Sequence, residues 1–170
     1  AASSTSGRLV AAMTMTLSPQ GAFMAMGGQQ RDLPASVRDD QLAALRLMPA
    51  VLAQTADDPD LSVRADGTER VGDVEGAALV LNLKGASARW VLDPADGRLL
   101  RVSRSAIGQA GPTQETQDLS DYRAIEGINL AFAAKVTRSQ GPSETSMLES
   151  CEINPTVDPA LFSKPAATTP

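Results

Sequence analysis

Over most of its length the chain alternates apolar and polar residues in short runs, the period-two pattern of strands that bury one face. Within residues 8–17, methionine and leucine side chains from position 13 onward alternate with threonines. Residues 23–26 are again apolar, and the turn residues Ser18–Gly21 stand between the two runs. We therefore expect a hairpin here, with the methionine side as its buried face and its end at Gly27–Gly28.

The period changes between residues 36 and 54, where leucine and methionine side chains recur at helical spacing. Ser36 is suited to cap this helix. Asp39 and Asp40 would then lie in its first turn, where carboxylates interact favourably with the helix dipole. Pro49 lacks a backbone N–H and predicts a break, followed by a second helical piece from Ala50 to Gln54.

From residue 61 onward, strand-like runs are separated by turn signals. We expect these turns at Asp66–Gly67, Asp73–Gly76, Asp93–Gly97, 105–113, Ala124–Gly127 and Gln140–Ser143. A succession of strands joined by short turns rich in Asp, Pro and Gly predicts one antiparallel sheet. The last strand is expected from Glu144 to Ile153.

The amino-acid composition excludes several kinds of catalytic and metal site and disfavours some partners, but it does not identify a ligand. The chain of 170 residues contains no histidine, which excludes Ser-His-Asp and Cys-His nucleophiles and His-liganded zinc. Its one cysteine, Cys151, excludes an internal disulfide and is interpreted as a buried structural residue. A net charge of −5 without a basic cluster disfavours nucleic acid and anionic membrane surfaces. No apolar run reaches the length of a membrane span.

Four pairs of carboxylates invite a catalytic interpretation: Asp39/Asp40, Asp57/Asp58, Asp93/Asp96 and Glu149/Glu152. We interpret the first pair as helix capping, and the next two as turn residues that bond to backbone N–H groups. The glutamates of the fourth pair, three apart on a strand, face opposite sides. A calcium site at Asp57, Asp58 and Asp60 stays open, although its spacing matches no EF-hand loop. We predict a protein that is not an enzyme and uses neither metal nor cofactor.

Four segments carry a resemblance to a known family: Gly28–Val37, Trp90–Leu99, Leu119–Ile128 and Asn154–Phe162. They resemble the LolA-like outer-membrane lipoprotein-sorting superfamily. More closely, they are similar to the C-terminal domain fused to bacterial insulinase-type zinc peptidases. The resemblance covers most of residues 21–165, and its motifs are structural turns.

This resemblance implies a mainly β (α+β) fold, in which a helical segment covers the concave face of a curved antiparallel half-barrel sheet. It also implies a periplasmic or secreted bacterial protein. Residues 8–165 are expected to form this single domain, with 1–7 as a linker or processed N-terminus and 166–170 as a tail. The peptidases' zinc motif needs histidine, so the resemblance implies no proteolytic role here.

In the best-known members of the superfamily the concave face takes up acyl chains. The corresponding candidates for an apolar ligand-binding groove are Met13, Met15, Leu17, Phe23, Met26, Trp90 and Phe132. Unbranched thioethers adapt to varied ligand shapes. We favour an ordinary core as the explanation of the methionine stripe and of Trp90, with Trp90 as a large filler whose indole N–H finds a partner. The sequence leaves both interpretations open.

Two functions follow from these observations. In the first, the chain is a non-enzymatic accessory or scaffold domain of a cell-envelope protein, contacting a neighbouring peptidase domain or another envelope protein. In the second, it is a periplasmic carrier that holds lipid or lipoprotein acyl chains between sheet and helix. Neither involves nucleic acid or a membrane span. We favour the first.

Overall fold

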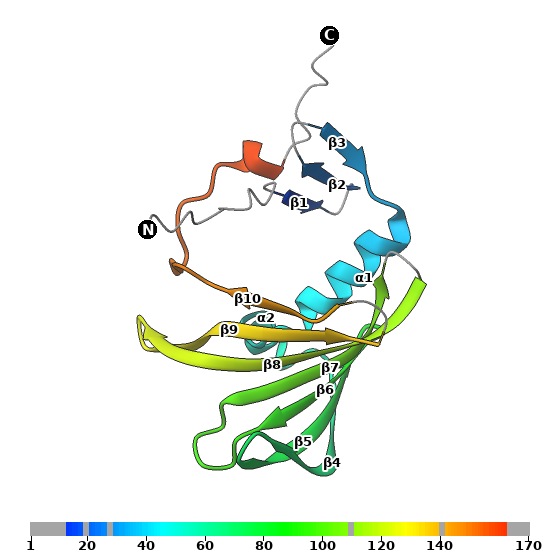
Figure 1. Ribbon diagram of the computed structural model, residues 1–170. Coiled ribbons are helices and arrows are strands. Elements are labelled where there is room, and N and C mark those ends of the chain that lie inside the picture. Colours follow the sequence, from blue (N-terminus) through cyan, green and yellow to red (C-terminus); the bar gives the residue numbers. More distant parts are fainter. Residues whose placement is uncertain (1–12, 19–20, 27–28, 109–110, 140–141, 163–170) are drawn as a thin grey trace, which may run out of the picture. The chain divides into compact units, whose positions relative to one another are not determined.

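The computed structural model is mainly β (Figure 1). It describes residues 13–18, 21–26, 29–108, 111–139 and 142–162. These form two antiparallel sheets, of three and seven strands, which confirms the predicted class at that level. The predicted linker and tail, residues 1–7 and 166–170, lie outside the described residues.

The chain divides into two compact units, each with its own sheet. The first unit comprises residues 1–39 and 157–170, and the second comprises residues 40–156. The expectation of a single domain over residues 8–165 stays a prediction.

The sheet of the first unit has the order β1-β2-β3. Its strands are β1 (Met13–Ser18), β2 (Gly21–Met26) and β3 (Gln29–Asp32). β1 and β2 pair antiparallel, which confirms the predicted hairpin. The predicted exit at Gly27–Gly28 lies outside the described residues.

The buried face of this hairpin differs from the predicted one. Thr16 is buried and pairs with Phe23, which is also buried. Met15, on the opposite face, is 38% exposed. The methionine side is therefore not the buried side at this position, because the pairing brings Phe23 to the threonine face. Alternation alone does not say which of two faces a neighbouring aromatic ring will cover.

The predicted helical segment forms two helices and a short 3₁₀ turn. α1 spans Ala35–Arg46, α2 spans Pro49–Leu52 and η1 spans Ala53–Thr55. Pro49 stands at the start of α2, which confirms the predicted break, since proline is tolerated where a helix begins.

The predicted cap of the first helix is wrong. The N–H groups of Val37 and Arg38 bond to the carbonyl of Pro34, so the helix starts before Ser36. The first turn of α1 holds no acidic residue, and Asp39 and Asp40 lie beyond it. Pro34 has no N–H to satisfy and stands well just ahead of a helix.

The sheet of the second unit has the order β10-β9-β8-β7-β6-β5-β4, as Figure 1 traces. Its strands are β4 (Ser62–Val71), β5 (Val74–Leu83), β6 (Ala86–Leu92), β7 (Leu99–Gly108), β8 (Gly111–Ile125), β9 (Ile128–Arg138) and β10 (Glu144–Met147). Sequence neighbours pair antiparallel throughout, which confirms the predicted meander. The sheet is open, with β4 and β10 at its two edges.

Two of the predicted turns are absent from their expected places in the described strands. Asp66–Gly67 is a bulge within β4, where the register shifts between Ala65 and Thr68, and Gly67 has a φ of +76°. A glycine in this conformation serves a bulge as well as a hairpin turn. The chain reverses later, since β4 runs to Val71 and β5 begins at Val74.

The predicted loop over 105–113 is also wrong. β7 continues to Gly108 and β8 starts at Gly111, and their pairing reaches that glycine pair. At the other end of the sheet, β10 stops at Met147. Glu149 and Glu152 therefore lie beyond the strand on which they were placed, and Cys151 there is only half-buried.

One face of the larger sheet carries the main apolar core, and we call it the core face. Leu81 and Leu83 of β5 are almost completely buried there beside Trp90 of β6. The register of β5 and β6 places these side chains on one side of the sheet. Leu47, which follows α1, belongs to the same cluster, and Leu52 packs against it. The helical segment thus shares its core with the sheet.

Gly76 of β5 provides a test of the packing on the opposite face of the sheet, where Val91 lies. A Cβ at this position would lie 2.4 Å from Val91 Cγ1 and 3.0 Å from the carbonyl oxygen of Leu92. Val91 is completely buried and has little room to move. We expect Gly76→Ala to lower the free energy of unfolding by about 2 kcal/mol, measured by urea denaturation. Gly21→Ala in β2, where no atom lies within 4 Å, should change it little. Equal effects of the two substitutions would contradict this account.

Candidate binding site

The larger sheet divides between β6 and β7. Their ladder pairs Leu92 with Leu99 at one end and Arg89 with Ser103 at the other. Both strands run on past Arg89 and Ser103, yet no pairing between them is found among the described residues there. We call these divergent ends, Ala86–Ala88 of β6 and Arg104–Ala106 of β7, the fork.

A cavity of about 450 Å³ lies at the fork, within the range typical of ligand sites. It is lined by both strand ends and by α1: Asp40, Ala43, Ala44, Leu47, Val80, Gly85, Ala86, Ser87, Ala88, Arg89, Ser103, Arg104, Ser105 and Gln114. Most of these side chains are small. The cavity therefore exposes backbone and hydroxyl groups, which bind by hydrogen bonding and do not by themselves supply a nucleophile with a base.

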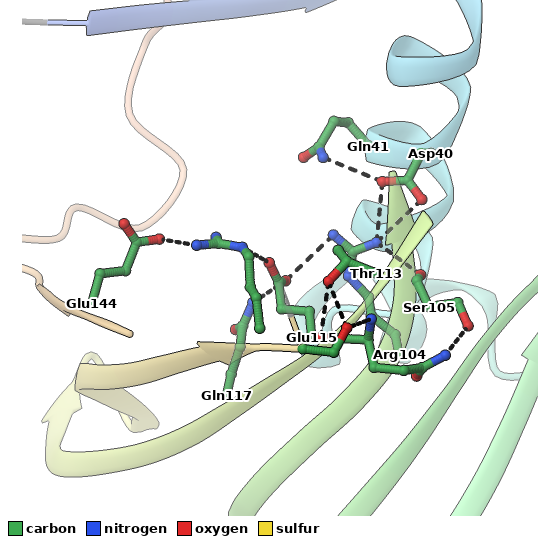
Figure 2. A network of polar contacts seen from close by, with 11 residues as sticks. Asp40, Gln41, Arg104, Ser105, Thr113, Glu115, Gln117 and Glu144 are labelled. Atoms are coloured by element: carbon green, nitrogen blue, oxygen red, sulfur yellow. Dashed lines mark hydrogen bonds and ion pairs between the residues drawn. The ribbon is translucent and has the colours of Figure 1, made fainter. Parts of the chain in front are cut away.

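A buried ionic network holds the β7 side of the fork. Figure 2 shows the Arg104 guanidinium between Asp40 of α1 and Glu115 of β8. Arg104 Nη1 donates to Asp40 Oδ2 at 3.2 Å, and Arg104 Nη2 lies 3.5 Å from Glu115 Oε1. The three side chains are only 12%, 14% and 8% exposed. They connect the helix to the β7–β8 hairpin.

Glu115 extends this network across the next two strands. Its Oε2 accepts from Arg138 Nε at 2.9 Å, and Arg138 Nη1 donates to Glu144 Oε1 at 2.7 Å. Gln117 Nε2 donates to the other oxygen of Glu115, as Figure 2 also shows. The buried carboxylate is thus paired with two arginines and an amide, which offsets the cost of removing its charge from water. Breaking such a pair leaves an uncompensated charge behind.

The opposite side of the sheet carries a second row of ion pairs, which we call the polar face. Glu69 of β4 contacts both Arg89 of β6 and Arg101 of β7. Arg89 also bonds to Asp66, and Arg101 also bonds to Asp118 of β8. Charges of opposite sign therefore alternate across several strands, and each member has a partner.

The surroundings shift the pKa values of this row. Burial by itself would raise the pKa of Glu69, but the hydrogen bonds from Arg101 and Arg89 outweigh it and hold that pKa below its usual value. The hydrogen bond from Arg89 lowers the pKa of Asp66. The hydrogen bond to Asp118 raises the pKa of Arg101. All these groups are charged at neutral pH.

The residues predicted to line one apolar groove fall in both compact units. Trp90 is in the core of the second unit, and no partner for its indole N–H is found among the described residues. Phe132 is buried on β9, with the Arg123 guanidinium 4.3 Å from its ring centre. In the first unit Phe23 is buried and Leu17 is half-buried.

The methionines among these candidates lie on β1 and β2. Met15 and Met26 are exposed, the latter by 53%. The strand position of Met13 is described, opposite Met26 in the register, but its side chain is not. Whether the candidates of the two units line one groove stays a prediction.

The first unit has its own cavity, of about 540 Å³. It is lined by Ser18, Gly21, Ala22, Phe23, Asp32, Leu33, Ala35, Arg38 and Phe162. Among the side chains that the structure describes, Phe23 is the one predicted groove residue in this lining. Phe162, from the closing motif of the resemblance, is a second aromatic residue here and is largely exposed.

The turn carboxylates have the role expected of them. Asp93 Oδ1 accepts from the N–H of Ala95, and Asp58 Oδ1 accepts from that of Asp60. Lys84 Nζ lies 2.6 Å from Asp58 Oδ2. Within the described ranges no three acidic or cysteine side chains gather as a metal site. The helices in the described part of the chain are all too short or too polar to cross a bilayer.

Sequence reasoning missed the fork and its ionic network. Arg104 directly precedes the predicted loop over 105–113, and Glu115 follows it by two positions. A signal was present, because Val102, Arg104 and Ala106 alternate along β7 and therefore share the core face. A charge within an apolar alternation indicates a buried partner.

Comparison of the chain with protein-family models, with curated proteins and with solved structures finds no match.

The ionic network predicts that removing the negative charge of Glu115 destabilises the folded protein strongly. We expect Glu115→Gln to lower the free energy of unfolding by about 3 kcal/mol, because Arg104 and Arg138 lose their shared counter-charge in a buried place. Glu144→Gln removes a mostly exposed partner of Arg138 and should cost less than about 1 kcal/mol. Denaturant titrations of the two variants measure the difference. Equal losses of unfolding free energy in the two variants would show that the burial of Glu115 does not increase its contribution to stability.

The polar face predicts a dependence of stability on pH. Since the pKa of Glu69 is lower in the folded than in the unfolded chain, its contribution is complete above the ordinary glutamate pKa. The contribution is lost as the pH falls toward the folded value. We expect Glu69→Gln to lose less stability than the unsubstituted protein between about pH 5 and pH 3, by thermal unfolding. Glu149→Gln, at an exposed position, should follow the unsubstituted protein; parallel curves for all three would refute the assignment.

Proposed function

We propose that this chain is a non-enzymatic scaffold domain of a bacterial cell-envelope protein associated with a zinc peptidase. In this proposal the larger sheet is a half-barrel and the α1–α2 segment covers its concave face. The partner is the neighbouring peptidase domain or another envelope protein. The resemblance of the turn motifs supports this setting.

The observation that carries the proposal is the buried leucine cluster that the helical segment shares with the core face, beside a fork cavity that contains the Arg104–Asp40 ion pair. Leu47 is 5% exposed, and Leu81 and Leu83 are each 2% exposed. A carrier needs a preformed cavity between sheet and helix, because protein cores are close-packed and resist displacement. A scaffold needs a firm core, and these contacts provide one.

The state of the buried carboxylates supports a structural role as well. Glu115 is bonded to Arg138 and lies near Arg104, and Asp93 is bonded to Arg98. A general acid or base must exchange its proton with a substrate. A carboxylate oxygen that accepts a hydrogen bond from an arginine has that lone pair occupied. These groups therefore serve to connect strands.

The carrier remains a second candidate because of the first unit. Its cavity of about 540 Å³ is lined by Phe23 and Phe162. Met15 and Met26 of the same unit are exposed. Aromatic rings and flexible thioethers suit an acyl chain. In this alternative the ligand occupies the first unit, with the core face of the second unit closed by its own side chains.

Binding of palmitate distinguishes the scaffold role from the carrier role. We expect the purified protein to carry no amphiphile and to form no one-to-one complex when palmitate is added in excess, as measured by native mass spectrometry. The reason is that the leucine cluster fills the core face around Trp90, and that the cavity at the fork holds serine hydroxyls and the Arg104–Asp40 ion pair beside its alanines, which does not suit an acyl chain. A saturable complex that is lost in Phe23→Ala but kept in the control Phe132→Ala would favour the carrier.

The scaffold role has its own measurement. Amide hydrogen exchange is compared between this chain alone and the complete gene product that contains it, each purified separately. Slower exchange on the strands of the larger sheet in the complete product is expected, because docking shields strand amides. Identical exchange throughout would contradict the scaffold role.

A further inference from the structure

The fork presents two peptide edges to one cavity. On one side β6 is paired with β5 through Ala86–Ala88, and on the other β7 is paired with β8 through Arg104–Ala106. Successive residues of a strand direct their N–H and C=O groups to alternate sides. Each edge therefore has backbone groups directed away from its existing partner, toward the other arm of the fork.

We propose that the fork takes up a short extended segment of a protein partner, which inserts as a strand between β6 and β7. This inference deepens the proposed scaffold role and rests on it, since it specifies how the partner is held. Strand addition satisfies unpaired edge groups with main-chain hydrogen bonds, and pockets for alternate side chains provide selectivity.

The lining of the cavity sets the chemistry of that segment. On the core face, the side chains around the fork other than the Arg104–Asp40 ion pair are apolar, with Ala86 and Ala88 from β6 and Ala43 and Leu47 from the helical segment. On the polar face the fork carries the hydroxyl groups of Ser87 and Ser105. An inserted strand alternates between these two faces. The segment that fits is therefore apolar, polar and apolar at three successive positions.

The charges at the fork favour a segment that is itself uncharged. Arg104 is neutralised by Asp40 and Glu115, and Arg89 is bonded to Asp66 and Glu69. A charged side chain in the segment would lose hydration without gaining a free counter-charge. The segment is thus recognised by its backbone and its apolar side chains.

The ionic network keeps the arms of the fork apart before a segment arrives. Arg104 of β7 is held by Asp40 of α1 and by Glu115, so this end of β7 is fixed to the helix and to β8 (Figure 2). A site held open in advance loses less free energy to ordering when it binds. Glu115 is accordingly a positioning residue for this site.

The test uses the synthetic peptide acetyl-Ser-Leu-Thr-Leu-Ser-amide and amide chemical shifts of the labelled protein. We expect saturable shifts at Ala86–Ala88 and Arg104–Ala106. The same peptide with N-methylated leucines keeps its side chains but loses two N–H donors, and should bind at least about tenfold more weakly. Equal binding of both peptides, or saturable shifts only outside the fork, would overturn strand insertion.

Two exposed serines that both pair with Asn82 provide matched variants. Ser87 of β6 lines the cavity, whereas Ser62 of β4 is outside its lining. Ser87→Phe places a bulky ring in the path of the segment and should abolish the shifts, and Ser62→Phe should leave them intact. Binding unaffected by Ser87→Phe would refute the site. If the complete gene product nevertheless protects the sheet from exchange, the scaffold role stands and this inference alone fails.

Discussion

The contact on which the candidate site depends is the buried pairing of Glu115 with Arg104 and Arg138. It joins the helix, through Asp40, to three consecutive strands of the sheet. Buried charges without partners are strongly destabilising, so each member restricts where the others can lie. Arg104 is held toward the helix directly beyond the last β6–β7 pair, Arg89 with Ser103, and the cavity lies at the same place.

Both faces of the larger sheet contribute to the stability of the domain, whereas the fork is the place where a partner could be recognised. The core face is filled by leucines and Trp90 together with Leu47, which argues for a domain that holds its own shape. The polar face carries alternating charges from Asp66 to Asp118 that are satisfied among themselves. The side chains described on these two faces thus satisfy one another without a small ligand. The peptide edges of the fork differ, since they present hydrogen-bonding groups that a further strand would satisfy.

Local chemistry explains what could be predicted and what could not. Pro49 ends a helix because it lacks an N–H, and Asp93 holds a turn through a backbone bond, so both were readable from the sequence. Asp66–Gly67 misled, because a glycine with positive φ serves a bulge and a turn alike. Thr16 misled as well, since its burial depends on Phe23 across the hairpin.

By itself the sequence determined the antiparallel meander, the helical interruption and the absence of histidine chemistry, because alternation, proline and residue type act locally. Only the tertiary structure decided that Arg104 of β7 meets Asp40 of α1, two residues separated by more than sixty positions along the chain. Only the structure decided that β6 and β7 part beyond Arg89 and Ser103. Such outcomes are set by competition among distant partners for the same buried charge, which no local pattern records.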